Sequence, residues 1–434
     1  MSTEPGTLII LSQVYPPDAA SVGQHMHDAA AELARRGRRV RVVTSRRGYE
    51  DPSKAFPARE MRDGVDVVRV PLSSFGKKSL PVRAVAMFLF MTQCFWQAVT
   101  ARKLECIVVS TSPPMCSFAA VLAGAIRRVP IKFWVMDLNP DQAIQLGIIK
   151  EKSLVARIFT WFNRVILRRA VDVVALDRFM AERLNRKVDA SAKMHVMPPW
   201  PHDAHLDSVP LEKNPFRNAH GLDGKFVVMY SGNHGLTTPV RTVLRAALSL
   251  RQRDDIVFMF IGGGLGKKDV ERTIAEHNPP NVRSLPYQPM DQLRYSLSAA
   301  DVHLVTMSDG LVGIIHPCKI YGAMRIGRPV LFIGPTPSHA SDLLDEGQCG
   351  WHVKDEDDKA TAALIERIVA MPKAELAAMG QRGARLIDDK YSMARLRTAF
   401  CDVVEKGLPP VPALAPDAAA ARAINRSGDV HSAA

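Results

Sequence analysis

The stretch HPCKIYGAMRIGRPVL, His316 to Leu331, predicts a loop, a short helix that begins at Lys319, and then a buried strand. Gly322 and Gly327 bracket the helix, and Arg328 opens the strand. A basic side chain at a helix start adds a positive charge to free backbone N–H groups, so an anion such as a diphosphate is its natural ligand. Taken alone, the same residues also fit an ordinary αβ unit with a surface lysine.

The rest of the chain repeats this alternation of apolar strands and amphipathic helices. The pattern is typical of α/β proteins with doubly wound parallel sheets. A chain of 434 residues is too long for one ordinary core. Residues 198–220 are rich in proline and asparagine and read as a linker. The sequence therefore predicts two Rossmann-like domains that face a cleft, at 1–205 and 206–390, a terminal helix at 391–407 and a disordered Ala- and Pro-rich tail at 408–434.

The positive charge of the chain is unevenly placed. The net charge is +13, and residues 1–205 carry 30 Lys and Arg against 18 Asp and Glu, a balance of +12. Such asymmetry predicts that the first half faces an anionic partner. An anionic membrane surface and a nucleic acid both fit the charge alone, and general solubility is the plain alternative.

The cysteines and the N-terminus point to a reducing compartment. None of the six cysteines forms a CxxC pair, and their spacing fits no zinc ligand set, so no metal is expected. The opening MSTEPGTLIILSQ has no basic region before its apolar run, so we expect no signal peptide and a cytoplasmic location.

The segment AVAMFLFMTQCFWQAV at 84–99 is almost wholly apolar and follows Lys77, Lys78 and Arg83. A membrane-spanning helix needs about 20 apolar residues, so this one is too short. A buried domain helix is the favoured reading. An interfacial helix, with basic flanks and several aromatic side chains, remains the alternative.

Ligands of open α/β sheets bind beyond the carboxyl ends of the strands, so residues just after strands are the site candidates. In the second domain these are glycine turns that allow close backbone approach, and they lie at Gly232, Asn233 and Gly235 and at Gly263 and Gly264. No acidic residue follows at the distance typical of a dinucleotide ribose contact, which argues against NAD. In the first domain, Gly23 marks a helix start suited to an acceptor or phosphate, and Asp137 follows an apolar strand. Asp137 could accept a proton in a cleft or simply cap a helix.

Taken in their order along the chain, several segments of the sequence resemble the family 4 glycosyltransferases of GT-B architecture. They are most similar to the branch that builds colanic acid, O-antigen and other exopolysaccharides. The resemblance covers residues 7–405. It rests on eight pieces, namely YPPDAASVGQ with AELARRGRRVRVVT, MDLNPDQAIQLGIIK, VMPPW, YSGNHG, IGGG, AADVHLV, HPCKIYGAMRIGRPV and DEGQCGWHV.

The resemblance implies a donor nucleotide-sugar in the second domain, an acceptor in the first, and retaining transfer without a metal or other cofactor. The chain departs from the family's E-x7-E pattern, because Gly322 and Ile314 replace its two glutamates. The polysaccharide branch instead carries a Pro-x-Lys, matched here by Pro317 and Lys319, which makes Lys319 the expected diphosphate ligand. Asp137 matches the branch's Asp-Leu-x-Pro segment, and Asp342 is a weaker candidate for contact with the sugar.

We therefore expect a glycosyltransferase that moves a sugar from a UDP- or GDP-sugar to a polyprenyl-diphosphate-linked saccharide at the inner face of the plasma membrane. Its peripheral attachment to anionic lipid would explain the basic first half. Nucleic acid is not an expected partner. A catalytically inactive GT-B binding subunit and a GT-B epimerase remain alternatives, and the missing glutamates keep the first of them open.

Overall fold

The computed structural model describes residues 6–18, 20–48, 51, 53–73, 80–113, 116–202 and 207–411. The basic pair Lys77 and Lys78 and almost all of the tail expected to be disordered lie outside these residues. The chain divides into two compact units. Unit 1 holds the residues up to Val135, Phe162–Val174 and those from Arg397 onward, and unit 2 holds Met136–Trp161 and Ala175–Leu396.

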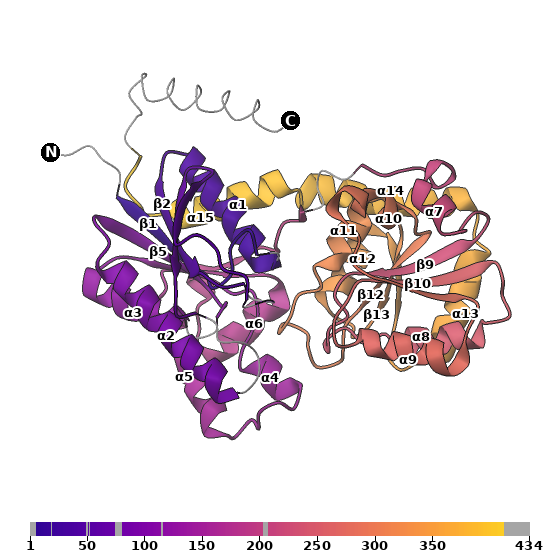
Figure 1. The fold of residues 1–434 in the computed structure, drawn as a ribbon, viewed down its shortest axis with the longest axis horizontal. Coiled ribbons are helices and arrows are strands. Elements are labelled where there is room, and N and C mark those ends of the chain that lie inside the picture. Colours follow the sequence, from indigo (N-terminus) through magenta and orange to yellow (C-terminus); the bar gives the residue numbers. More distant parts are fainter. Residues whose placement is uncertain are drawn as a thin grey trace, which may run out of the picture. The chain divides into compact units, whose positions relative to one another are not determined.

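The first sheet has eight strands in the order β3-β4-β2-β1-β5-β6-β7-β8. Its strands β1, β2 and β5 are labelled in Figure 1. The pairings from β4 to β7 are parallel, whereas β3 runs antiparallel to β4 at one edge. The strands are β1 Thr7–Leu11, β2 Arg39–Ser45, β3 Arg59–Arg62, β4 Val65–Val70, β5 Leu104–Ser110, β6 Ile131–Trp134, β7 Asp172–Ala175 and β8 Met194–Val196. The helices between them are α1 Ser21–Arg35, α2 Leu80–Val99, α3 Cys116–Arg127, α4 Asp141–Gln145, α5 Leu154–Arg169 and α6 Arg178–Lys187.

The second sheet has six strands in the order β11-β10-β9-β12-β13-β14, and all its pairings are parallel. The strands are β9 Phe226–Ser231, β10 Ile256–Ile261, β11 Val282–Leu285, β12 Val302–Thr306, β13 Val330–Ile333 and β14 Gly350–Val353. The helices are α7 Pro215–Ala219, α8 Arg241–Ser249, α9 Lys267–His277, α10 Leu293–Ser298, α11 Lys319–Arg325, α12 His339–Gly347, α13 Asp358–Val369, α14 Lys373–Lys390 and α15 Met393–Glu405.

The fold class predicted from the sequence, two domains with parallel α/β sheets, is confirmed. The antiparallel edge strand β3 was not predicted, because REMR is short and polar and lies at a sheet edge, where burial imposes no apolar pattern.

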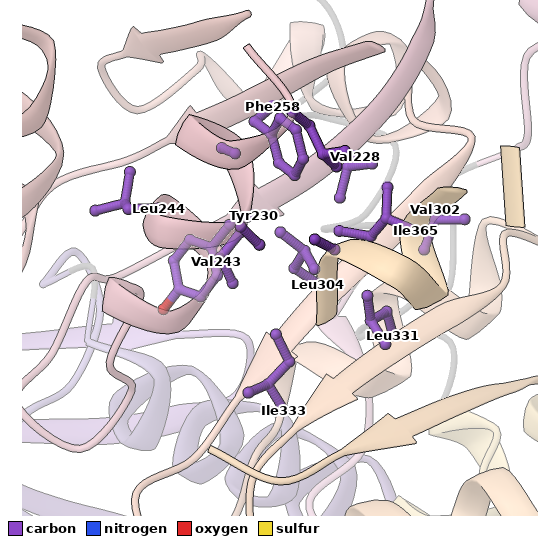
Figure 2. Packing of buried hydrophobic residues seen from close by; sticks show 14 of the residues in the cluster. Val228, Tyr230, Val243, Leu244, Phe258, Val302, Leu304, Leu331, Ile333 and Ile365 are labelled. Carbon is purple, nitrogen blue, oxygen red and sulfur yellow. The ribbon is translucent and has the colours of Figure 1, made fainter. Parts of the chain in front are cut away.

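One apolar core of unit 2 lies between the six-stranded sheet and helices α8 and α13 (Figure 2). Parallel strands are buried on both faces, so β10 and β13 are continuous apolar runs. Tyr230 at the end of β9 belongs to this core and is 0% exposed, yet its hydroxyl oxygen reaches the strand end. The core thus fixes a polar atom at the edge where ligands of such sheets bind.

The terminal helix α15 runs from unit 2 into unit 1, which contains its residues from Arg397 onward. Arg36 pairs with Asp402 at 2.7 Å and with Glu405 at 2.8 Å, and Arg38 pairs with Glu405 at 2.9 Å. These ion pairs hold the end of the helix against α1 and β2.

Helix α2 contains the apolar segment 84–99 and has two different faces. Phe90 and Cys94 are fully buried, while Phe88 is 55% exposed and Trp96 is 61% exposed. Within the described ranges, no helix is both long enough and apolar enough to cross a membrane.

Candidate functional site

Two glycine turns interlock at the ends of β9 and β10. Gly232 and Gly262 both have φ +128°, and a Cβ on Gly262 would lie 2.0 Å from the Gly232 carbonyl oxygen. A Cβ on Gly264 would lie 2.3 Å from Asn233 Oδ1. The His234 N–H donates to the Gly263 carbonyl at 2.7 Å and locks the two turns together. Only glycine permits this backbone approach, so the turns that the sequence singled out form one structure.

Lys319 begins α11 and reaches across to the first of these turns. Its Nζ donates to the Asn233 carbonyl at 2.6 Å and to the Tyr230 hydroxyl, and lies 4.2 Å from the centre of the Tyr230 ring. A Cβ on Gly232 would lie 2.7 Å from Lys319 Cε, so this glycine makes room for the lysine. The structure therefore brings together Lys319, Gly232, Asn233 and the turn at Gly264, which are far apart in sequence.

The charge on Lys319 is weakly stabilised in this position. Within the described residues, the groups that accept from its amine are a carbonyl and a hydroxyl, and no carboxylate pairs with it. Burial lowers the pKa of Lys319 to about 7, against an ordinary value near 10.5. A bound phosphate would supply the opposite charge and restore the protonated form. The Lys319 amine, which pairs with no carboxylate of the described residues, is therefore suited to bind an anionic ligand.

His234 lies in the same turn and was not singled out from the sequence. Its ring is 0% exposed and packs 4.6 Å from the Tyr230 ring, and neither ring nitrogen has a hydrogen-bond partner among the residues that the structure describes. Burial, followed by the charge of Lys319, lowers the pKa of His234 to about 4, so the ring is neutral near pH 7. A neutral histidine beside Lys319 adds no competing charge to the turn.

Asp137 and Pro317 both adjoin the segment that leads to Lys319. The Leu138 N–H donates to the Ile314 carbonyl at 3.0 Å, and Asp137 lies within electrostatic range of Cys318. Burial raises the pKa of the Asp137 carboxyl, which makes it a better proton acceptor than an ordinary aspartate. The structure thus places Asp137 in the neighbourhood of the lysine. Pro317 is buried, and its carbonyl accepts from the Ile320 N–H at 3.2 Å.

Asp342 on α12 makes a two-pronged ion pair with Arg178 on α6. The distances are 2.6 Å from Arg178 Nε and 2.9 Å from Arg178 Nη2. Its carboxylate oxygens therefore already have a cationic partner, and contact with a sugar would have to compete with that pair.

Four further side chains join beside α11 and carry no signal in the sequence. Asp177, His316, Tyr321 and His339 are linked in series by hydrogen bonds of 3.0, 2.9 and 2.7 Å. The carboxylate and the two imidazoles are of the types that bind metals, and their ligand atoms lie within 4.8 Å of one another. The sequence could not indicate this cluster, because its members come from three separate segments, which hold Asp177, His316 with Tyr321, and His339.

Gly23 belongs to unit 1 and lies in the first turn of α1. A Cβ there would lie 3.0 Å from the Tyr15 backbone nitrogen, so the glycine lets the helix start approach the loop after β1. Nearby, the Tyr15 hydroxyl contacts His27 Nδ1 at 2.9 Å, and His27 Nε2 lies 3.0 Å from Asp63.

The chain matches two family models in sequence. Residues 21–200 match the glycosyl transferase 4-like domain, and residues 212–386 match the glycosyl transferases group 1. It is 24% identical over 391 residues to "Probable glycosyltransferase WbjE" of Pseudomonas aeruginosa, covering 89% of this chain and 94% of that protein. It is also 24% identical over 374 residues to WcaI of Escherichia coli (strain K12), a glycosyl transferase assigned to colanic acid biosynthesis, covering 83% and 91%.

The fold agrees with a solved structure. HepE of Anabaena, in complex with UDP-glucose, superposes with a TM-score of 0.69 at 13% identity and covers 92% of this chain and 99% of its own. The likeness at this identity concerns the fold. Together with the two matched domains, it confirms the expectation raised by the motifs around Lys319: the chain belongs to the GT-B glycosyltransferases of family 4.

Proposed function

We propose that this glycosyltransferase takes a sugar from a nucleotide-diphosphate sugar and adds it to a polyprenyl-diphosphate-linked saccharide during cell-surface polysaccharide synthesis. The observation that carries the donor assignment is the Lys319 amine, held over the glycine turn at Gly232 without a carboxylate partner among the described residues. HepE binds UDP-glucose, and WcaI is assigned to colanic acid biosynthesis, which supports a UDP-sugar donor and a polysaccharide product.

Lys319 would act on the leaving group. When the bond from the sugar to the diphosphate breaks, negative charge develops on the nucleotide diphosphate, and a cation beside it lowers the barrier. Backbone N–H groups of the glycine turns would add neutral donors to the same oxygens. We propose that transfer is retaining, as the family resemblance implies. We also propose that it needs no metal, because Lys319 can supply the positive charge.

Asp137 would act on the acceptor. Its raised pKa and its place beside the segment 314–319 suit a carboxylate that accepts a hydrogen bond or the proton of an acceptor hydroxyl. Asp137→Asn is expected to reduce transfer while leaving the affinity for UDP unchanged, since it removes only the proton-accepting group. Full turnover by this variant would exclude the role.

A transfer assay with radiolabelled UDP- and GDP-sugars and a lipid extract tests the donor assignment. A charge-assisted hydrogen bond contributes about 1.5–3 kcal/mol, so Lys319→Ala is expected to weaken nucleotide binding and transfer about 10- to 150-fold. Lys268→Ala is the matched control, because Lys268 is an exposed lysine on α9. If Lys319→Ala binds UDP as tightly as the parent protein, the assignment is wrong. Tight UDP binding without transfer from any sugar would favour an inactive binding subunit.

The attachment to an anionic membrane is proposed from one face of unit 1. Helix α2 exposes Val85, Phe88 and Trp96, whose spacing puts them on one side of the helix. The helix packs on α3, which exposes Ile126, and exposed arginines follow on the neighbouring elements, at Arg128, Arg164 and Arg168. Apolar side chains with a basic surround are typical of helices that lie in the membrane interface.

Flotation with vesicles of neutral or anionic lipid tests this surface. The protein is expected to float with anionic vesicles, and Phe88→Ser with Trp96→Ser is expected to abolish flotation. Met61→Ser is the control, because Met61 is equally exposed, at 68%, but lies on β3. Equal recovery with both kinds of vesicle would exclude electrostatic attachment.

A further inference from the structure

The chain of side chains beside α11 joins four elements of unit 2. Asp177 caps the start of α6, and its Oδ1 accepts from the Met180 N–H at 2.8 Å while its Oδ2 lies 3.0 Å from His316 Nδ1. His316 Nε2 lies 2.9 Å from the Tyr321 hydroxyl, which lies 2.7 Å from His339 Nε2. The His316 side chain is 1% exposed and that of Asp177 is 2% exposed, so water does not compete for these bonds.

The proton positions in this series can be assigned in one consistent direction. Asp177 is an acceptor, so His316 donates from Nδ1, and a neutral His316 ring then accepts at Nε2. Tyr321 then donates its hydroxyl proton to His316, and His339 donates from Nε2 to the tyrosine oxygen. Each of the three bonds has one donor and one acceptor when both imidazoles are neutral.

The segment that these side chains hold leads directly to Lys319. The loop between β12 and α11 runs against α6: Arg183 Nε donates to the Val312 carbonyl at 2.7 Å, and Gly313 has φ +69°. A Cβ on Gly313 would lie 2.5 Å from the Phe179 carbonyl oxygen. These contacts fix the first half of the loop by its backbone. The last part, immediately before the lysine, is held by the side chain of His316.

Tyr321 and His316 therefore flank Lys319 on both sides in sequence, two residues after it and three before it. A shift of either would move the start of α11, because the helix has only seven residues, Lys319–Arg325. The lysine's own bonds to Asn233 and Tyr230 require that start to stay in place.

We propose that Asp177, His316, Tyr321 and His339 are positioning residues, a buried hydrogen-bonded series that holds the start of α11 so that Lys319 meets the donor diphosphate. The proposal rests on the proposed function in one respect, the role of Lys319. The series itself is a feature of the chain that can be measured without any nucleotide.

A metal centre is the rival reading of the same residues. A metal bound to Asp177, His316 and His339 would have to replace the hydrogen bond between Asp177 and His316 and the two that the Tyr321 hydroxyl makes to the imidazoles, whose rings lie 4.3 Å apart. The hydrogen-bonded arrangement already satisfies both nitrogens of His316 and the Nε2 of His339. The geometry therefore favours the series of hydrogen bonds.

The first test is Tyr321→Phe, which removes the central hydroxyl and keeps the ring. Tyr391→Phe is a matched control, because the Tyr391 ring lies 5.9 Å from that of Tyr321 and its hydroxyl bonds to Glu346 instead. Tyr321→Phe is expected to speed amide hydrogen exchange in residues 316–325 and to weaken UDP binding about tenfold, as the loss of a hydrogen bond worth about 1–1.5 kcal/mol predicts. Tyr391→Phe is expected to change neither.

A second pair of variants keeps the test decisive if Tyr321→Phe folds poorly. His339→Gln retains an N–H donor close to the position of Nε2, whereas His339→Leu has a similar size and no donor. Glutamine is expected to preserve, and leucine to lose, both the slow exchange of α11 and the tight UDP binding. Equal behaviour of the two variants, or of the two tyrosine variants, would overturn the proposal.

Three further outcomes separate this proposal from the metal-centre reading and from the proposed role of Lys319. Stoichiometric zinc in the purified protein, lost in His339→Leu, would replace the hydrogen-bonded series by a metal centre. If Lys319→Ala leaves UDP affinity unchanged while Tyr321→Phe still speeds exchange in α11, the diphosphate role of Lys319 fails and the hydrogen-bonded series stands. If Lys319→Ala weakens UDP binding and Tyr321→Phe changes nothing, the series fails alone.

Discussion

The two compact units bury polar groups in different forms. Unit 1 buries charges in pairs: Lys132 and Asp172 lie 2.5 Å apart at 4% and 5% side-chain exposure, and Glu32 pairs with Arg35 and Arg36. Unit 2 also buries one such pair, Arg217 with Asp301 at 3.1 Å, but in addition it buries uncharged imidazoles, at His234, His303 and His339. The charges in these pairs of unit 1 therefore satisfy one another, and losing one should cost stability. Among the described residues, the groups that the Lys319 amine contacts, the Asn233 carbonyl and the Tyr230 hydroxyl, are neutral, which leaves the charge of Lys319 for a ligand.

The largest expected effect comes from breaking a charge pair of unit 1. Lys132→Ala leaves Asp172 buried without its main partner, which costs about 3–5 kcal/mol of unfolding free energy. The exposed Lys406, 3.5 Å from the other carboxylate oxygen, can compensate only in part. Urea denaturation followed by circular dichroism measures the loss.

The control for this prediction removes both charges. Lys132→Met combined with Asp172→Leu replaces the pair by apolar groups and is expected to recover most of the stability. A loss below about 1 kcal/mol for Lys132→Ala would mean that water reaches Asp172, in contrast to its burial.

The buried imidazoles of unit 2 predict an acid sensitivity that unit 1 does not share to the same degree. Burial lowers the pKa of His303 to about 4, and its Nε2 lies 3.0 Å from the Leu297 carbonyl. An unfolded histidine titrates near pH 6.5, so between pH 6.5 and 4 the unfolded state binds more protons than the folded state. The free energy of unfolding therefore decreases as the pH is lowered through this range. For His303 the expected loss from pH 8 to pH 5 is about 2 kcal/mol.

Glu32 in unit 1 also loses its contribution on acidification, but in a lower pH range. Hydrogen bonds from Arg35 lower its pKa to about 2, so its contribution is lost only as pH falls from about 4.5 toward 2. Hydrogen exchange at pH 8 and pH 5, corrected for the intrinsic rates, should show a larger loss of protection in β12 than in β5. Equal losses in both strands would contradict the comparison.

The glycine that faces Lys319 gives a binding effect of intermediate size. Gly232→Ala adds a Cβ at φ +128° and 2.7 Å from Lys319 Cε, so the backbone or the lysine must move. We expect UDP affinity to fall about tenfold, or 1.4 kcal/mol, by titration calorimetry. Gly224→Ala is the control, because Gly224 also has a positive φ, +72°, but its Cβ would meet no atom within 4 Å. Similar losses in the two variants would assign the effect to backbone strain.

Part of this site could be predicted from the sequence, because the carboxyl ends of parallel strands share one edge of a sheet. The turns after β9 and β10 and the lysine after β12 meet there for that reason. The hydrogen-bonded series could not be predicted. Asp177 and His316 are 139 residues apart, and their contact depends on how α6 packs against a loop. The partner of Asp342 was hidden for the same reason, since Arg178 lies 164 residues away.

The smallest expected effect is the pH dependence of donor binding, and it tests the contrast between paired and spare charge most directly. Burial lowers the pKa of Lys319 to about 7, so raising the pH from 6.5 to 7.5 should reduce the protonated fraction of the free enzyme and weaken binding about threefold. UDP-glucose is the proper probe, because its diphosphate diester keeps a constant charge in this range. Lys319→Arg should remove the pH dependence, because an arginine stays protonated. If the parent protein binds UDP-glucose equally well at both pH values, Lys319 has a charged partner that holds its proton, and unit 2 then resembles unit 1 at this position.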